Sequence, residues 1–150
     1  MECVIIEDNV IERMTEANEL AESGELKKAY KIYDEIAQSV PDSKLRVLVL
    51  HNMLLLADTI TSIKKGKKKR TWAKKCEEIA RELAELCENY HDEMLSEALA
   101  HFMLGKVHLF FGRKEEAKKE LSFAYELAQQ AEFDPLCKDI ARLFFKLQSS

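Results

Sequence analysis

Glycine and proline are scarce in this chain of 150 residues, which contains four glycines and two prolines. Strand-rich folds need more turn residues and more runs of β-branched residues, so the shortage of glycine and proline excludes a sheet-based architecture. In contrast, 47% of the residues are hydrophobic and 33% are charged. This mixture is typical of a soluble all-α protein, and the length suits a single domain with a buried core.

Membrane and secretion signals are also missing. By inspection, no apolar stretch reaches the roughly 18 residues that span a bilayer. The first residues, Met-Glu-Cys-Val-Ile-Ile-Glu-Asp, lack the basic start and the long apolar segment of a secretory signal. We therefore expect a cytoplasmic protein.

Catalytic and metal-binding signatures are equally lacking. The sequence contains no glycine-rich phosphate loop, no Gly-x-Ser-x-Gly elbow and no His-Glu-x-x-His motif. His101 and His108 lie seven residues apart on one helix face, but nothing supplies a third and a fourth metal ligand, so we expect core histidines. No two cysteines have Cys-x-x-Cys spacing, and we expect buried free thiols. The four cysteines are Cys3, Cys76, Cys87 and Cys137. The chain is thus predicted to be no enzyme and to hold no metal or cofactor.

Apolar periodicity and helix caps predict seven helices. The first starts after Asn9, which forms a capping-box-like pair with Glu12. The last starts with Asp134 as its N-cap and Pro135 in its first turn. The predicted ranges are about 10–24, 26–39, 43–63, 71–89, 92–111, 114–132 and 134–148.

Small residues follow a distinctive pattern over residues 104–124. Gly105 interrupts an apolar helical run, where a glycine costs about 1 kcal/mol relative to alanine. Such a cost is tolerated where a second helix approaches the backbone closely. Gly112 is placed to end this helix, and Ala117 and Ala124 recur seven residues apart on the next one. The pattern predicts two antiparallel helices packed tightly through a short turn.

A second copy of this pattern lies near the N-terminus. Gly24 and Ala29 precede Gly112 and Ala117 by the same offset of 88 residues (112 − 24 and 117 − 29). The spacing of small and large residues resembles the tetratricopeptide repeat (TPR), a helical hairpin of 34 residues. The resemblance implies a right-handed superhelical array of hairpins that binds other proteins. An unrelated helical bundle is the alternative.

The resemblance divides the single predicted domain, residues 1–150, into three hairpins and a capping helix. Repeat 1 covers about 10–43, repeat 2 about 44–91 with a basic turn at 64–70, repeat 3 about 92–132, and the capping helix 134–148. Repeat 2 is irregular. The pattern of repeat 3 starts 54 residues after that of repeat 2 (98 − 44) and not 34 residues after it, so repeat 2 carries about twenty inserted residues. It also has His51 where the other copies have Ala17 and Gly105.

In TPR proteins the first helix of each hairpin lines a concave surface that contacts the ligand. Carried over by the resemblance, these positions are Met14, Asn18, Leu48, Asn52, Leu99, Phe102, Lys106 and Phe110. Met14, Leu99 and Met103 replace the cations with which many family members hold a carboxylate, so we do not expect that mode of binding. The groove would instead hold a peptide or an amphipathic helix of a partner by apolar anchors. Alternatively, Phe102 and Phe110 are core residues, or a second copy of the chain fills the groove.

A basic run is the other candidate for function. It consists of Lys64, Lys65, Lys67, Lys68, Lys69 and Arg70, followed by Lys74 and Lys75. These residues are eight of the 23 cationic residues of the chain, whose net charge is −4. The rest of the chain has 15 cationic and 27 acidic residues and therefore a net charge of −12. The run is interpreted as a solvated turn at a helix C-terminus. The alternatives are a nuclear-import signal or an electrostatic tether to an acidic protein, a nucleic acid or an anionic membrane, and the lack of interleaved aromatics argues against nucleic acid.

Overall fold

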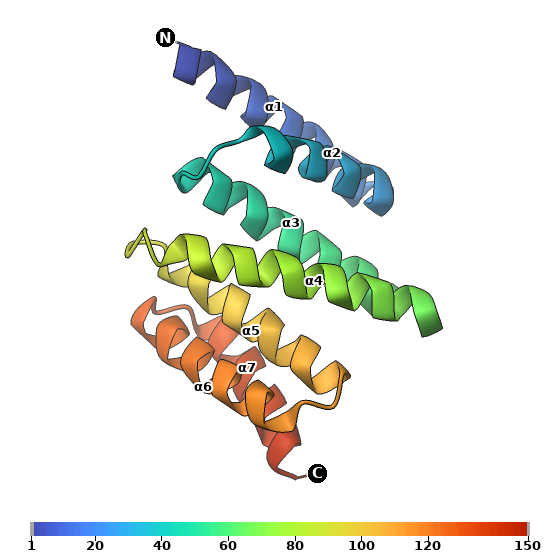
Figure 1. Ribbon diagram of the computed structural model, residues 1–150, viewed down its shortest axis with the longest axis vertical. Helices are drawn as coiled ribbons and strands as arrows, with labels where there is room; N and C mark the ends of the chain where they lie inside the picture. Colours follow the sequence, from blue (N-terminus) through green and yellow to red (C-terminus); the bar gives the residue numbers. More distant parts are fainter. Residues whose placement is uncertain (1, 150) are drawn as a thin grey trace.

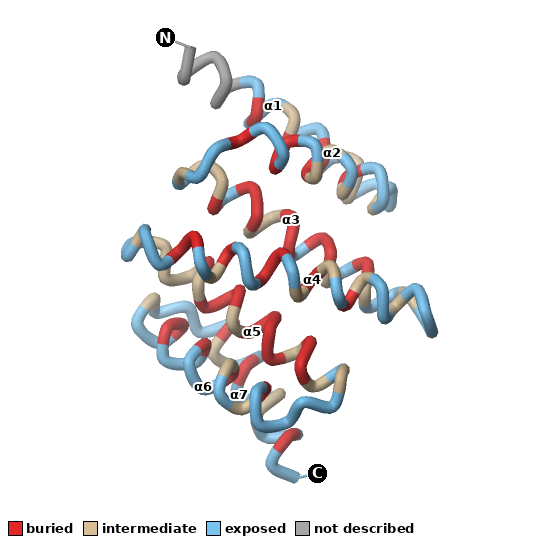
Figure 2. The backbone as a smooth tube through the Cα atoms, in the orientation of Figure 1, coloured by how far each residue is buried: buried red, intermediate tan, exposed pale blue. Residues whose placement is uncertain are grey.

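Short connections join consecutive helices, so that each helix packs antiparallel to the next one along the chain (Figure 1). The computed structural model describes the backbone of residues 2–149 and the side chains of residues 9–149. Over these residues the chain forms the helices α1 (Glu2–Glu22), α2 (Leu26–Ser39), α3 (Lys44–Ile63), α4 (Gly66–Cys87), α5 (Met94–Phe110), α6 (Lys114–Gln130) and α7 (Asp134–Gln148). Buried residues follow the whole stack and form one continuous core (Figure 2).

The hairpin turns have the geometry that the glycines predict. Gly24 and Gly112 have φ angles of 90° and 76°, a region that other residues enter only with strain. After Gly112, the backbone N–H of Arg113 donates to the carbonyl of His108 at 2.7 Å, which closes a Schellman motif. Glu132 closes the end of α6 in the same way with a φ of 55°, although no glycine marks this turn, which the sequence indicated by the start signal at Asp134 and Pro135.

Two helix starts differ from the prediction. α1 begins at Glu2 and not after Asn9, because no proline or glycine precedes Asn9 to stop the helix. Its early residues include Cys3, whose side chain lies outside the described residues. α4 begins at Gly66 and not at Thr71, because lysine and arginine are good helix formers. The predicted basic turn 64–70 is therefore wrong as a turn, since two residues make the connection and the rest are helical.

The other helix ends agree with the predicted ends within two residues. Ser43 caps α3, and its hydroxyl accepts a hydrogen bond from the backbone N–H of Arg46 at 3.2 Å. Asp134 is the first residue of α7, and Phe133 takes the capping position predicted for Asp134. α7 covers repeat 3 with the buried side chains of Leu136, Ile140 and Leu147, as its amphipathic pattern predicted.

The close approach of α5 and α6 is confirmed at Gly105. A Cβ atom on Gly105 would lie 2.6 Å from Cδ2 and 2.7 Å from Cγ of Leu121, well inside van der Waals contact. Leu121 is fully buried, and its side chain would have to shift to admit a Cβ atom at Gly105. A glycine allows the two helices to pack at this separation with Leu121 in its observed place.

The middle hairpin is longer than its neighbours, as the inserted residues predicted. α3 and α4 have 20 and 22 residues, whereas α2 has 14 and α5 and α6 have 17 each. His51, which the repeat pattern places where the other copies have Ala17 and Gly105, is half-buried, whereas Ala17 and Gly105 are buried. Ala57, six residues further along α3, is fully buried.

α3 also corrects the expectation about apolar length. Its 20 residues, Lys44–Ile63, are long and apolar enough to cross a membrane by length and composition alone. The helix packs against α2, α4 and α5, and its buried side chains belong to the common core. The helix is apolar because it packs against its neighbours at the centre of the core.

The close contact at Gly105 predicts the effect of a single methyl group. Gly105→Ala would raise helix propensity by about 1 kcal/mol, but overlap with Leu121 should cost more, so we expect a net loss of about 1–2 kcal/mol in the free energy of unfolding. Urea denaturation measures this change. In a Leu121→Ala background the same substitution should be neutral or stabilising, and an equal penalty in both backgrounds would rule out this contact as the cause.

Candidate functional site

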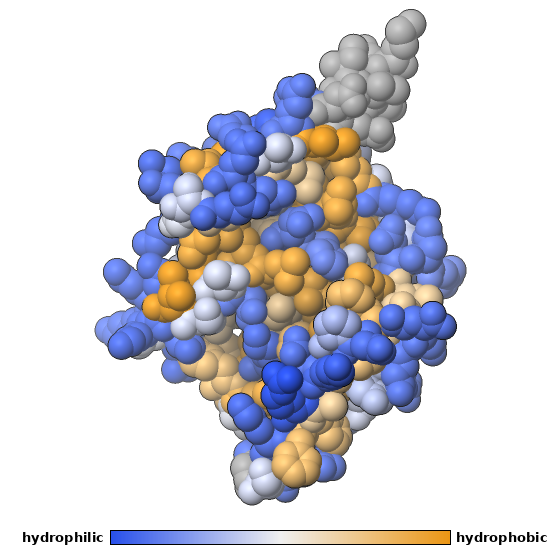
Figure 3. Space-filling view, turned by 180° about the vertical axis from the view of Figure 1, so that it is seen from behind, coloured by the Kyte–Doolittle hydropathy of each residue, from blue (hydrophilic) through white to orange (hydrophobic). Residues whose placement is uncertain are grey.

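Four helices, α1, α3, α5 and α7, lie on one face of the array, behind α2, α4 and α6 in Figure 1. They are the first helices of the three hairpins and the capping helix. Seen from this side, apolar side chains gather across the middle of the face and charged ones surround them (Figure 3). This is the surface that the sequence predicted to contact a ligand.

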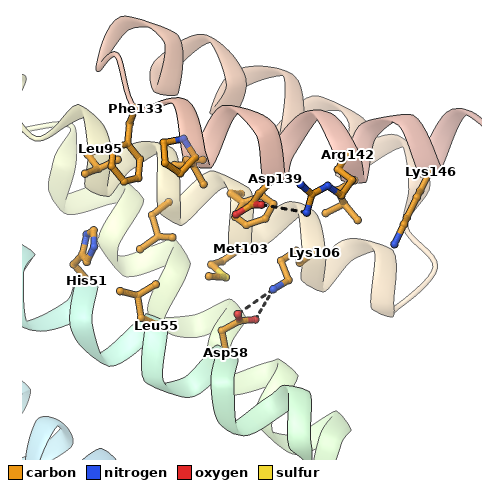
Figure 4. A pocket seen from close by; sticks show the side chains of 15 residues that line it. His51, Leu55, Asp58, Leu95, Met103, Lys106, Phe133, Asp139, Arg142 and Lys146 are labelled. Atoms are coloured by element: carbon orange, nitrogen blue, oxygen red, sulfur yellow. Dashed lines mark hydrogen bonds and ion pairs between the residues drawn. The ribbon is translucent and has the colours of Figure 1, made fainter. Parts of the chain in front are cut away.

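Two neighbouring hollows cross this face. The large hollow lies between α3, α5 and α7 and encloses about 560 Å³, and the small hollow lies between α3, α4 and α5 and encloses about 210 Å³. Apolar side chains make up most of the wall of the large hollow (Figure 4). They are Leu55, Leu95, Leu99, Phe102, Met103, Phe133, Pro135, Leu136 and Leu143.

An ion pair between Asp58 and Lys106 lines both hollows. The Lys106 ammonium group donates to the two carboxylate oxygens at 2.8 and 3.0 Å. It also lies 5.5 Å from the centre of the Phe102 ring, within range of a cation–π contact. Lys106, which the sequence placed on the ligand surface, therefore has an internal partner and adds no net charge to the groove.

The opposite wall of the large hollow is formed by α7, which the sequence assigned only a capping role. Asp139, Arg142 and Lys146 line the hollow from this helix (Figure 4). Arg142 lies 3.7 Å from Asp139, so these three side chains together leave one net positive charge at this side of the mouth of the hollow. Their spacing of three to four residues places them on one face of α7, and this was the only signal in the sequence that could have revealed the wall.

The predicted ligand residues from repeat 3 divide between wall and surface. Leu99 and Phe102 line the large hollow, but Phe102 is only 9% exposed and belongs equally to the core. Phe110 is 44% exposed, lines the small hollow and packs edge-on against Phe111. Leu55, which faces them from α3, is 41% exposed.

The predicted residues from repeats 1 and 2 lie apart from the hollows. Met14 is buried in the core, whereas Leu48 is exposed. Asn18 is exposed and accepts a hydrogen bond from the hydroxyl of Tyr33. Asn52 is half-buried, and its amide donates to the carbonyl of Leu48 one turn earlier at 2.8 Å. The two amides therefore have partners within the chain.

The predicted basic patch lies at the far end of the middle hairpin. Lys64 and Lys65 form the connection, and Lys67, Lys68, Lys69 and Arg70 follow in the first turn of α4. Lys69 also lines the small hollow. The guanidinium group of Arg70 lies 5.4 Å from the centre of the Phe111 ring.

The histidines and cysteines have structural surroundings. His108 is buried, as predicted, and His101 Nδ1 lies 2.5 Å from a carboxylate oxygen of Glu120. Cys76 and Cys87 are buried free thiols, and burial raises their pKa to about 11 and about 12, so neither is a reactive thiolate near neutral pH. Cys137 is only half-buried. Among residues 9–149 no three His, Cys, Asp or Glu side chains gather in a way that could hold a metal ion.

The overall shape matches a solved structure. The C-terminal TPR-containing domain of an FK506-binding protein from Plasmodium falciparum superimposes with a TM-score of 0.56, over 97% of this chain and 94% of that domain, at 17% sequence identity. The chain has a TPR-like fold. No protein-family model and no curated protein matches the sequence.

The apolar hollows lie on the face formed by the first helices of the hairpins, where the sequence comparison with the repeat placed ligand contacts.

His51 borders the large hollow, and its environment makes stability depend on pH. Its Nδ1 lies 2.8 Å from the Ser96 hydroxyl, and burial lowers its pKa below the usual value. His51 therefore takes up a proton more readily in the unfolded chain than in the folded one. The free energy of unfolding should consequently fall as the pH drops below about 6.5. His51→Gln should reduce this loss between pH 7.5 and 5.5 in urea titrations, whereas His91→Gln at an exposed position should leave it unchanged. An unaltered pH dependence in His51→Gln would contradict the assignment.

Proposed function

We propose that the chain is a non-catalytic adaptor or scaffold of the cytoplasm that binds a peptide or an amphipathic helix of a partner protein in the two hollows. The observation that carries the proposal is the large hollow. Its wall is mostly apolar, and side chains such as Leu55 remain half-exposed there and can contact a ligand. Grooves of this kind suit helices or extended segments that insert apolar anchors at regular spacing.

The charges of the groove narrow the kind of ligand. Asp58 and Lys106 neutralise one another, so the floor between the hollows favours an uncharged part of the ligand. Arg142 and Lys146 lie at one side of the mouth and favour an acidic residue that flanks the anchors. We therefore propose a segment with two or three apolar anchors and an acidic neighbour.

The size of the hollows is compatible with useful affinity. Full burial of one Leu, Ile or Phe side chain contributes about 1.5–3 kcal/mol. Two or three anchors would contribute about 5 kcal/mol, and part of this is offset by the ordering of the ligand and the loss of its overall freedom. The proposed interaction is thus of moderate strength, as suits a regulatory contact.

Substitutions on the face of the groove test this function. A peptide selected from a displayed random library against the purified chain serves as the probe, and fluorescence anisotropy measures its Kd. Leu55→Ala with Phe110→Ala removes two half-exposed contacts and should weaken binding at least tenfold. We leave Phe102 unchanged, because its burial makes a loss of folding the expected result of its removal.

A matched control removes the same kinds of side chain elsewhere. Ile63 and Phe145 are 60% and 72% exposed and line neither hollow on this face. Ile63→Ala with Phe145→Ala should change the Kd less than twofold, and raising the salt concentration should have little effect on the intact chain. Equal weakening by both pairs, or a second copy of the chain displacing the peptide, would contradict binding of a partner segment in the hollows.

A further inference from the structure

The connection between α3 and α4 projects from the body of the protein. Together these two helices form the longest hairpin of the array, and their shared end extends past the turns of the α1–α2 and α5–α6 hairpins (Figure 1). We name this end the basic tip and define it as residues 63–70. It contains Ile63, Gly66 and six cationic side chains.

The cations of the basic tip have no carboxylate partners. Eleven ion pairs connect side chains elsewhere in residues 9–149, and their cations come from all seven helices and from the turn residue Arg113. Within the same described residues, no carboxylate oxygen lies within 4.0 Å of a cationic group of the basic tip. The tip is therefore a concentration of uncompensated positive charge on a chain whose net charge is −4.

The helix boundaries remove the structural explanation for this charge. A solvated turn at the C-terminus of α3 would favour lysines, but only Lys64 and Lys65 lie there. The other four cations lie in the first turn of α4, where the helix dipole and the free N–H groups disfavour positive charge. Lys27, at the start of α2, adds to the crowding, and its ammonium group lowers the pKa of Lys64. An anion at the tip would relieve each of these repulsions.

An exposed aliphatic side chain accompanies the charges. Ile63, the last residue of α3, is 60% exposed next to Lys64 and Lys65. No aromatic side chain occurs within residues 63–71, so the lysines around Ile63 are not interleaved with rings on which nucleic-acid bases could stack. The ring of Phe111 reaches the tip only at Arg70, its last residue, and is partly buried. A projecting end with lysines around one aliphatic residue fits a flat surface that is both anionic and backed by hydrocarbon.

We propose that the basic tip docks the protein on the anionic face of a phospholipid membrane. Lys64, Lys65, Lys67 and Lys68 would contact lipid phosphates and carboxylates, and Ile63 would enter the boundary of the acyl chains. The large hollow between α3, α5 and α7 is formed by other residues and stays open to a partner in this arrangement. The small hollow shares Lys69 with the basic tip. The substitutions below leave Lys69 unchanged, so membrane docking and binding in the groove can be tested separately.

Co-sedimentation of the full chain with vesicles tests the docking. Vesicles of phosphatidylcholine with 30% phosphatidylserine should bind the chain, and vesicles of phosphatidylcholine alone should not. Each lysine near an anionic leaflet contributes about fivefold to partitioning, so the triple substitution Lys65→Gln, Lys67→Gln, Lys68→Gln should lower it about 100-fold. The triple substitution Lys31→Gln, Lys119→Gln, Lys138→Gln removes the same charge from exposed positions outside the tip and the hollows and should lower partitioning far less. Equal losses in the two triple variants, or no binding to the anionic vesicles, would overturn the proposal.

Ile63 distinguishes a membrane from other polyanions. Ile63→Ser should weaken binding to the anionic vesicles several-fold and leave binding to heparin, a single-stranded oligonucleotide and polyglutamate unchanged, because these probes have no hydrocarbon layer. Circular dichroism should show an unaltered fold, since the side chain is mostly exposed. Unchanged vesicle binding by Ile63→Ser, or tighter binding of the intact chain to the oligonucleotide or polyglutamate than to the vesicles, would show that the tip recognises another class of polyanion.

Discussion

The packing of α5 on α6 through Gly105 is the constraint on which the C-terminal half of the molecule depends. Leu121 occupies the space that a Cβ atom on Gly105 would need, so the separation of the two helices is set by the absence of one side chain. This separation fixes where α6 presents its outer surface to α7. In turn, α7 forms one wall of the large hollow. A glycine on a helix that contributes only part of the site thereby determines the width of the whole groove.

Local signals predicted most of the fold. Glycine turns, the serine cap of α3 and the periodicity of apolar residues gave seven helices in their observed order, because each signal acts within a few residues. The start of α4 was predicted wrongly because a run of lysines reads as a solvated turn, although the same residues propagate a helix well.

The groove was only partly predictable, because its key contacts join distant parts of the chain. Asp58 and Lys106 are 48 residues apart, and no pattern within either helix marks them as partners. Resemblance to the repeat selected Leu99, Phe102, Lys106 and Phe110, which line the two hollows. It gave no role to Arg142 and Lys146, since the capping helix has no counterpart among the ligand positions of the repeat. Their contribution follows only from how α7 crosses α5 and α6.

The double position of α7 has a thermodynamic consequence. Its inner side chains cover the last hairpin, while its charged edge borders the large hollow, so the hollow exists only while this helix is docked. A terminal helix that packs mainly on a single neighbour is the part of such an array that opens most readily. Any molecule that fills the hollow must therefore also hold the helix in place. Occupancy of the groove and local unfolding of the C-terminus are mutually exclusive states of one equilibrium, through which binding on one face would control exposure of apolar surface on the other.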